Sequence, residues 1–321
     1  MAAISAALSW DGSEFVIEHD VTEFAVTGET VSTLKPSDLA MVFLVRDDPE
    51  AGARPMPTLG LRDVGPAVKD LVRHGVSAVK VFAGGDRRDA LGSAGRARDS
   101  MMSRAIQEVK AADASMTVMT ETCLCSFTDT GECHVGDDAG SPDIAATIEA
   151  IAEQAVVQAK AGADIVGPAA MLPGSVRRVR QALDDDGRSG IRIMPHLIFD
   201  SRLYDGYRRT MDAIPASGER RVFQVDPQRP TRAVRTSLEF IEEGADMLLL
   251  EPALFCADVL VALKRICAVP LAPFSVSGEY TRLMGADGDH RLLFELFTML
   301  KRAGSDHIIT YAAAELARTL E

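Results

Sequence analysis

Short apolar runs alternate with amphipathic stretches of roughly 10 to 20 residues from position 41 to the end of the chain. Eight such runs can be counted: Met41–Val45, Ser77–Phe82, Thr117–Cys123, Asp164–Pro168, Ile191–Leu197, Asp246–Pro252, Leu271–Val276 and His307–Tyr311. Apolar strands that alternate with helices favour a parallel sheet, and eight of them are typical of a (β/α)8 barrel, also called a TIM barrel. We therefore expect an α/β chain in which residues 39–321 form one barrel.

One three-residue motif, which we call the Gly-small-Asp joint, recurs between a helix and the following strand ahead of three of these runs. Gly162-Ala163-Asp164, Gly244-Ala245-Asp246 and Gly304-Ser305-Asp306 each combine a glycine, which can end a helix in the left-handed conformation, with a small residue and an aspartate. Repeated helix–strand units produce such a recurrence, so we interpret it as structural. An open doubly wound sheet is the alternative, but no Gly-x-Gly-x-x-Gly follows a first strand, and dinucleotide binding therefore has little support.

The first 38 residues follow a different pattern. Phe15–Ile17, Phe24–Val26 and Thr30–Ser32 are short β-like pieces separated by acidic and glycine-containing turns. They are too few to bury a core of their own. We expect residues 1–38 to form an arm that packs on a partner subunit and supports a homo-oligomer.

The charge of the chain narrows the class of partner. The net charge is −13 and the pI is near 5.0. Nucleic acid and anionic membranes both favour a basic face, so neither is expected as a partner. No run of about 18 apolar residues is present to span a bilayer, and the start Met1–Ile4 lacks the basic residues of a signal peptide. We expect a cytoplasmic protein that acts on a small molecule.

Three of the five cysteines, Cys123, Cys125 and Cys133, fall within eleven residues at the end of the third apolar run. Thiolates suit zinc, and three protein sulfurs leave a fourth tetrahedral position open, as in catalytic zinc sites. The spacing of Cys123 and Cys125 is tight for a disulfide. The alternative is three buried thiols in a reducing compartment. Cys256 and Cys267 lie in apolar helical sequence and are interpreted as inert core residues.

The segment 200–232 is long for a plain connection after the fifth run, and we interpret it as an active-site lid. In barrel enzymes the chemistry lies at the carboxyl ends of the strands, where this segment begins. Its arginines stand out in an acidic chain: Arg202, Arg208, Arg209, Arg220 and Arg221. Guanidinium groups suit a substrate carboxylate or phosphate. A solvated basic loop is the alternative.

Several motifs together resemble the 5-aminolevulinate dehydratase family, also called porphobilinogen synthase. They are Thr120–Cys125 with Gly131–Cys133, Gly162–Pro168, Phe223–Pro227, Glu243–Met247, Val276–Tyr280 and Ile308–Tyr311, and the similarity covers roughly residues 40 to 320. The resemblance implies a barrel with an oligomer-building arm that condenses two aminolevulinate molecules into a pyrrole. It implies zinc on Cys123, Cys125 and Cys133, one substrate carboxylate held by Arg209, Arg220 and Gln224, and the other held by Ser277 and Tyr311.

The resemblance breaks at the family's two Schiff-base lysines. The first falls on Phe199 and the second on Glu251, and neither residue can form an imine. We therefore favour a diverged zinc enzyme that condenses, dehydrates or cyclises small keto or amino acids, with Glu251 as general acid or base and with Glu121 and His196 assisting. One alternative is a non-catalytic homologue that binds zinc and a carboxylate. The other is the family's ordinary activity with a relocated lysine, for which Lys80 is the candidate.

Overall fold

The computed structural model describes residues 33–47, 54–85, 87–137, 139–218, 221, 223–285 and 287–320, together with two short strands near the N-terminus. The chain divides into two compact units, Met1–Ser32 and Thr33–Glu321. In the first unit, β1 (Ser9–Trp10) pairs in antiparallel fashion with β2 (Phe15–Val16). The expected pieces at Phe24–Val26 and Thr30–Ser32 lie outside the described residues.

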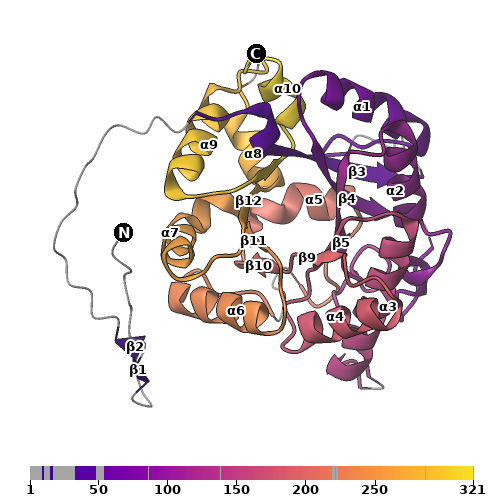
Figure 1. The fold of residues 1–321 in the computed structure, drawn as a ribbon. Helices are drawn as coiled ribbons and strands as arrows, with labels where there is room; N and C mark the ends of the chain where they lie inside the picture. The colour runs from indigo at the N-terminus through magenta and orange to yellow at the C-terminus, as the bar shows by residue number, and fades with distance from the viewer. Residues whose placement is uncertain are drawn as a thin grey trace. The chain divides into compact units, whose positions relative to one another are not determined.

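The second unit is built around eight parallel strands, one in each predicted run (Figure 1). They are β3 (Leu39–Arg46), β4 (Ala78–Gly84), β5 (Thr117–Thr122), β8 (Ile165–Pro168), the split strand β9 (Arg192–Ile193) and β10 (His196–Ile198), β11 (Leu248–Glu251), β12 (Leu271–Ser275) and β13 (Ile308–Thr310). Pro195 lacks an N–H group and lies in the short break between β9 and β10.

The split strand closes the barrel. Its first half, β9, pairs with β8, and its second half, β10, pairs with β11. The carbonyl oxygen of Ile193 in β9 also accepts the backbone N–H of Met247 from the far side, 3.2 Å away. Both edges of the sheet therefore meet at this one segment, and the TIM-barrel prediction is confirmed.

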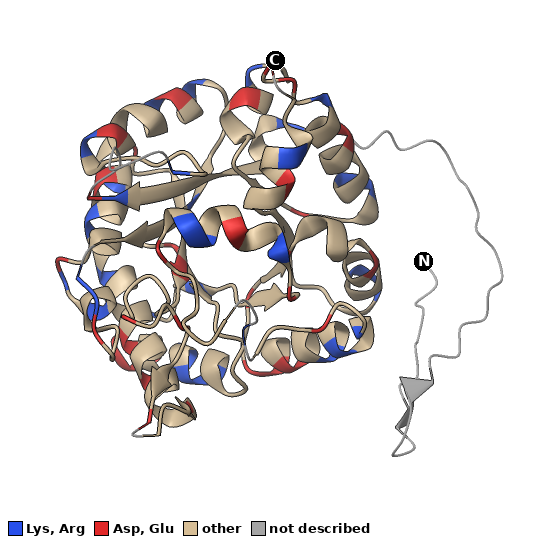
Figure 2. Cartoon of the chain, turned by 180° about the vertical axis from the view of Figure 1, so that it is seen from behind, with Lys and Arg blue, Asp and Glu red and all other residues tan. Residues whose placement is uncertain are grey.

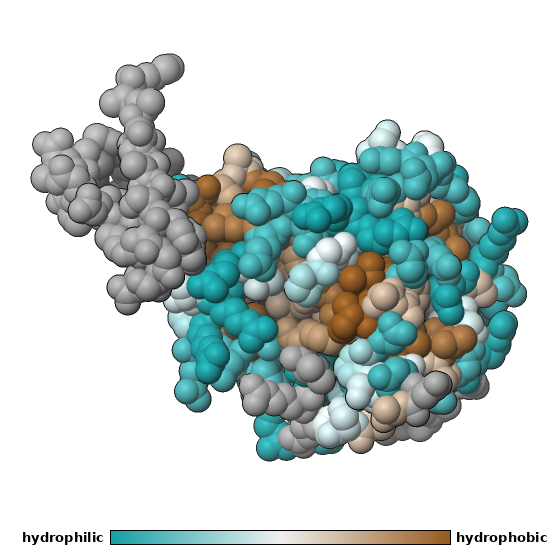
Figure 3. Space-filling model, turned by 90° about the horizontal axis from the view of Figure 1, so that it is seen from below, coloured by the Kyte–Doolittle hydropathy of each residue, from teal (hydrophilic) through white to brown (hydrophobic). Residues whose placement is uncertain are grey.

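Helices surround the strands in a ring (Figure 1). They are α1 (Leu61–Arg73), α2 (Met101–Ala112), α3 (Ile144–Ala161), α4 (Ser175–Asp185), α6 (Pro230–Glu242), α7 (Ala257–Ile266), α9 (Arg291–Ala303) and α10 (Ala313–Ala317), with the short α5 (Asp205–Thr210) and α8 (Ser277–Leu283) at the mouth of the barrel. Figure 2 shows basic and acidic residues interspersed on the outer helices, and Figure 3 shows mainly hydrophilic residues with small apolar patches. No helix in the described ranges is long and apolar enough to cross a membrane.

The recurring Gly-small-Asp joint ties each strand to its neighbour. Gly162 and Gly304 end α3 and α9 in the left-handed conformation, with φ of 115° and 109°. The aspartates then accept a backbone N–H from the first or second residue of the preceding strand: Asp164 from Val118, Asp246 from Ile193 and Asp306 from Leu271, at 2.7 to 2.9 Å. The joint is therefore structural, as the sequence predicts.

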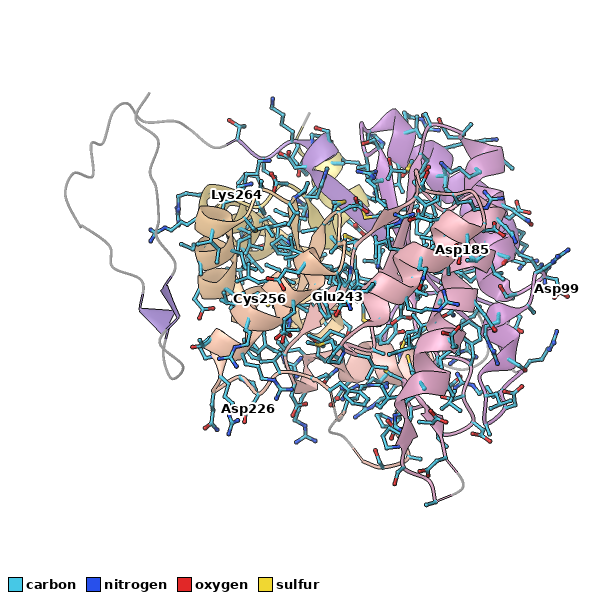
Figure 4. All side chains as sticks on the ribbon, turned by 60° about the horizontal axis from the view of Figure 1, so that its bottom comes forward. Asp99, Asp185, Asp226, Glu243, Cys256 and Lys264 are labelled. Atoms are coloured by element: carbon cyan, nitrogen blue, oxygen red, sulfur yellow. The ribbon has the colours of Figure 1, made fainter. Side chains whose placement is uncertain are left out.

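Acidic side chains also hold the outer helices together. Glu243, labelled in Figure 4, follows α6, and its carboxylate accepts the backbone N–H of Gly174 at the start of α4, 2.6 Å away. A carboxylate at a helix N-terminus satisfies a free N–H group and is favoured by the helix dipole. This hydrogen bond links the end of α6 to the start of α4, on the side of the barrel where β9 and β10 lie.

Candidate active site

The three clustered cysteines meet at the carboxyl end of β5. The strand ends at Thr122, and the turn that follows brings the Sγ atoms of Cys123 and Cys125 to 3.4 Å from one another, well beyond a disulfide bond. Cys133 returns to them from the next loop, and the three Sγ atoms all lie within 4.8 Å of one another. Gly131 makes this return possible, because its φ is 67° and a side chain there would clash with the carbonyl of Ile214.

The cluster fits a tetrahedral zinc ion. Sulfurs at about 2.3 Å from zinc are about 3.8 Å apart, close to the spacing found here. Hydrogen bonds from the Cys123 and Cys125 thiols hold the pKa of Cys133 well below its ordinary value, and the Arg221 guanidinium, 2.7 Å from the Cys133 Sγ, acts in the same direction. The site therefore already favours a thiolate, the form that binds metal. Cys256 is buried elsewhere, and burial raises its pKa, as expected for an inert thiol.

A pocket opens beside this cluster, at the carboxyl ends of the strands. Its solvent-accessible space is about 50 Å³, enough for a few water molecules or one small polar group. Its lining is made of the three cysteines and Phe82, Glu121, Ala169, Ile198, Tyr204, Tyr207, Arg208, Arg221, Gln224, Glu251, Phe274, Val276, Ser277 and Tyr311. Tyr204, Tyr207, Arg208, Arg221 and Gln224 come from the segment predicted to be a lid.

Among the described residues, the arginines that line the pocket are Arg208 and Arg221, and the predicted Arg209 does not line it. Arg208 is buried in the pocket wall, with its guanidinium 5.4 Å from the centre of the Tyr204 ring, whereas Arg209 is exposed on the outer side of α5. Neighbouring helical residues point about 100° apart, so only one of the pair can face the pocket. Arg220 lies outside the described residues, and Arg221 lines the pocket beside the cysteines.

The other predicted carboxylate ligands differ in how much of their hydrogen-bonding capacity is already used. Ser277 lines the pocket, but its Oγ donates to the Leu203 carbonyl and accepts the Tyr207 N–H, each at 3.0 Å. In contrast, the hydroxyls of Tyr311 and Tyr204 and the Oε1 of Gln224 are buried in the pocket with no hydrogen-bond partner among the described residues. Such atoms are costly unless a ligand or water satisfies them. They are the polar groups best placed to meet a substrate.

Glu251 faces the pocket from the end of β11, and the predicted assistant His196 lies behind it. The His196 Nδ1 is 2.9 Å from Glu251 Oε1, and its Nε2 is 2.7 Å from the Nζ of Lys80. Burial raises the pKa of Glu251 to about 8 and lowers the pKa of His196 well below its ordinary value. The imidazole is therefore neutral, and its contact with Glu251 is a hydrogen bond rather than an ion pair.

Glu121 lines the pocket from β5 and is not hydrogen-bonded to Lys80, His196 or Glu251 in the contacts described above. It accepts the hydroxyl of Tyr207 at 2.8 Å, and burial raises its pKa. Phe199, at the place where the resemblance puts the first family lysine, is buried but does not line the pocket. The neighbouring Ile198 faces the pocket instead, because strand residues alternate between faces.

The strand ends could be found from sequence, but the exact set of side chains could not. Glu121, Glu251, Gln224, Ser277, Tyr311 and the three cysteines lie in or at the pocket, whereas His196 lies beneath it. Sequence reasoning missed the roles of Tyr204, Tyr207 and Phe82. A tyrosine on either side of the Asp205-Gly206 pair, close to the arginines of the predicted lid, was the available signal.

Comparison with known proteins places this site in a family. The model of the family described as delta-aminolevulinic acid dehydratase matches residues 24–319. The chain belongs to this family. A relative of that name from Bacillus subtilis is 36% identical over 259 residues, covering 79% of this chain and 80% of the relative. Another from Streptomyces coelicolor is 34% identical over 305 residues, covering 89% and 91%.

A solved structure supports the same assignment. Delta-aminolevulinic acid dehydratase from Toxoplasma gondii, in complex with the reaction product porphobilinogen, matches with a TM-score of 0.85 and 27% identity, covering 89% of this chain and 86% of that one. The resemblance seen in the sequence is thus confirmed at the level of family and fold. Members of the dehydratase family are lyases that act in biosynthesis, and this chain has a cysteine group that could hold a metal in the same fold.

Proposed function

We propose that the chain is a zinc-dependent lyase of the aminolevulinate dehydratase family that condenses, dehydrates or cyclises small keto or amino carboxylic acids without a lysine Schiff base. The observation that carries this proposal is the combination of groups in one pocket. The three thiols, Gln224, Ser277 and Tyr311 line the pocket, while a carboxylic acid, Glu251, stands where the resemblance puts an imine-forming lysine. An acid cannot form an imine, but it can transfer a proton.

Some residues of the pocket would bind the zinc ion and the substrate, and Glu251 would transfer a proton. Zinc held by Cys123, Cys125 and Cys133 would supply a Lewis acid that polarises a substrate carbonyl. Arg208 and Gln224 would hold a substrate carboxylate, and the free hydroxyl of Tyr311 would donate to a second polar group. Glu251, with a pKa near 8, would exchange a proton with the substrate carbon or leaving group.

The walls of the pocket would exclude water and limit substrate size. Phe82, Phe274 and Tyr207 pack together, with ring centres 5.8 Å apart for the two phenylalanines and 5.2 Å apart for Phe82 and Tyr207. A site of about 50 Å³ favours a small acid unless the segment 200–232 opens as a lid. We further infer a cytoplasmic homo-oligomer built through the arm, working in a specialised biosynthetic pathway.

The family's ordinary reaction is the second candidate, because the relatives described above carry the name of that enzyme. It would need Lys80 as the replacement nucleophile. The Lys80 side chain is fully buried and does not line the pocket, whereas Phe82, two residues along the same strand, does; the Lys80 Nζ lies 5.7 Å from the centre of the Phe82 ring. This arrangement weighs against imine formation by Lys80.

One experiment separates the candidates. The purified protein, loaded with zinc, is incubated with aminolevulinate and borohydride and analysed by intact mass, and in parallel it is screened for turnover of keto and amino acids. We expect no reduced adduct, together with turnover of another small acid that is lost in Glu251→Gln. A reduced adduct on Lys80 and porphobilinogen formation would overturn the proposal in favour of the ordinary reaction. No turnover of any acid, with zinc and carboxylate binding intact, would instead indicate the non-catalytic homologue.

A further inference from the structure

Lys80 is a fully buried cation that extends from β4 into the barrel interior. Its Nζ is 2.7 Å from the carbonyl oxygen of Thr120 in β5 and 2.7 Å from His196 Nε2 in β10. Gly167 in β8 leaves the space for this crossing. A Cβ on Gly167 would lie 2.6 Å from Lys80 Nζ and 2.9 Å from His196 Nε2. Residues of four strands therefore surround this one contact between an amine and an imidazole.

When Lys80 is protonated, the donors and acceptors in this contact follow from its chemistry. An ammonium group on Lys80 can only donate, so His196 Nε2 must accept. His196 is neutral, so its single N–H is then on Nδ1, and it donates to Glu251 Oε1, 2.9 Å away. The three side chains therefore form one continuous chain of hydrogen bonds, of which only Glu251 lines the substrate pocket.

We propose that Lys80, His196 and Glu251 form a proton relay in which Lys80 is the proton reservoir for Glu251; this rests on the proposed role of Glu251 as general acid or base. Once Glu251 has given its proton to the substrate and is ionised, the Nδ1–H proton of His196 moves to Glu251 Oε1 while an Nζ–H proton of Lys80 moves to His196 Nε2. The ammonium–carboxylate pair becomes a neutral amine and a carboxylic acid, and His196 changes tautomer. No proton is gained or lost, and the reverse shift restores the start.

The surroundings make the two charge states of the relay close in free energy. Burial lowers the pKa of Lys80 and raises that of Glu251, so neither charge is strongly favoured inside the barrel. Lys80 is a positioning residue in this scheme, because it acts on substrate only through Glu251. Its positive charge also favours the ionised form of Glu251.

The other groups that face Glu251 act in known directions. Glu121 on β5 and Glu279 on α8 favour its protonated form, and Arg208 on α5 favours its ionised form. Tyr204, Tyr311 and Cys256 also lie within electrostatic reach and are neutral, because burial raises the pKa of each. Lys80 also lowers the pKa of Glu121, so a substitution at Lys80 acts on Glu251 both directly and through Glu121; the direct effect is the larger, because Lys80 influences Glu251 more strongly than Glu121 does.

The test is a titration of Glu251 in the full-length protein with ¹³C-labelled glutamate carboxyls, in which the Glu251 signal is identified by its loss in Glu251→Gln. Lys80→Met removes the charge and the donor, and Lys69→Met, on the exposed face of α1, is the matched control. We expect the Glu251 pKa to rise by about 1 unit or more in Lys80→Met and to stay unchanged in Lys69→Met. An unchanged or lowered Glu251 pKa in Lys80→Met would overturn the relay.

A second measurement needs no variant and no substrate. Imidazole ¹⁵N resonances of the wild-type protein at pH 6 report which nitrogen of His196 carries the proton. The relay requires protonated Nδ1 and unprotonated Nε2, whereas an Nε2–H tautomer or a doubly protonated ring would contradict it. Because neither readout depends on turnover, failure of the relay is distinguishable from failure of the proposed reaction.

Discussion

Replacing Glu251 by glutamine is expected to make the protein more stable relative to wild type as the pH rises. Glu251 is only 5% exposed, and burial raises its pKa from 4.5 to about 8. A carboxyl group whose folded-state pKa is raised favours the folded state at low pH, and that contribution is lost as the pH rises through the folded pKa. Between pH 4.5 and 8, the unfolded chain has an ionised Glu251 while the folded protein keeps it protonated.

The size of the effect follows from this difference. Each pH unit between the two pKa values lowers the free energy of unfolding by about 1.4 kcal/mol. The destabilisation caused by the Glu251 carboxyl therefore grows by about 2.5 kcal/mol between pH 5.5 and pH 7.5. Glutamine has nearly the same shape and does not titrate, so Glu251→Gln should escape this loss. Comparing variant with wild type at each pH cancels the titration of most other groups.

The assay is urea unfolding followed by circular dichroism at both pH values, with the exposed Glu108→Gln on α2 as the control. We expect the stability difference between Glu251→Gln and wild type to grow by about 2.5 kcal/mol in favour of the variant from pH 5.5 to 7.5, and that of the control to stay flat. A flat or opposite trend for Glu251→Gln would refute the reasoning that this carboxyl is held protonated by burial.

Two further predictions use matched pairs of residues. Arg208→Met should weaken the binding of levulinate, a small keto acid, by roughly 10- to 100-fold in calorimetry, because it removes a charge-assisted hydrogen bond. Arg209→Met, on the exposed side of the same helix, should leave levulinate binding unchanged. Equal losses in both variants would contradict the assignment of Arg208 to the pocket. Gly167→Ala should destabilise the fold by about 2 to 4 kcal/mol in urea unfolding, because the new Cβ would lie 2.5 Å from the Thr120 carbonyl oxygen. Gly190→Ala is the control, since a Cβ there meets open space, and it should change stability by less than about 0.5 kcal/mol. Similar values for both variants would show that the barrel interior is not tightly packed around Gly167.

The barrel was predictable because its signals are local and repeated. Each apolar run is long enough to be recognised, and the Gly-small-Asp joint marks where a helix ends and a strand begins. The split of the fifth strand was not predicted, because it depends on how Pro195 meets two neighbouring strands at once. Residues 1–38 give weaker signals, and most of their predicted pieces lie outside the described residues.

The site was predictable to the level of strand ends but not of individual side chains. The cysteine spacing identified the group that could hold a metal, because three thiols so close in sequence converge once the chain turns after β5. Choosing between Arg208 and Arg209 required the rotational phase of a helix only six residues long. The contact of Lys80 with His196 joins residues 116 positions apart across the barrel, and no local pattern encodes such a contact.

The most direct test of the central claim is the zinc content per chain of the protein purified without added metal, repeated on Cys125→Ala. A catalytic zinc centre made of Cys123, Cys125 and Cys133 predicts about one zinc per chain in the wild-type protein and little in the variant. Absence of tightly bound zinc from both proteins would contradict the metal-centred account and move the assignment to the non-catalytic homologue.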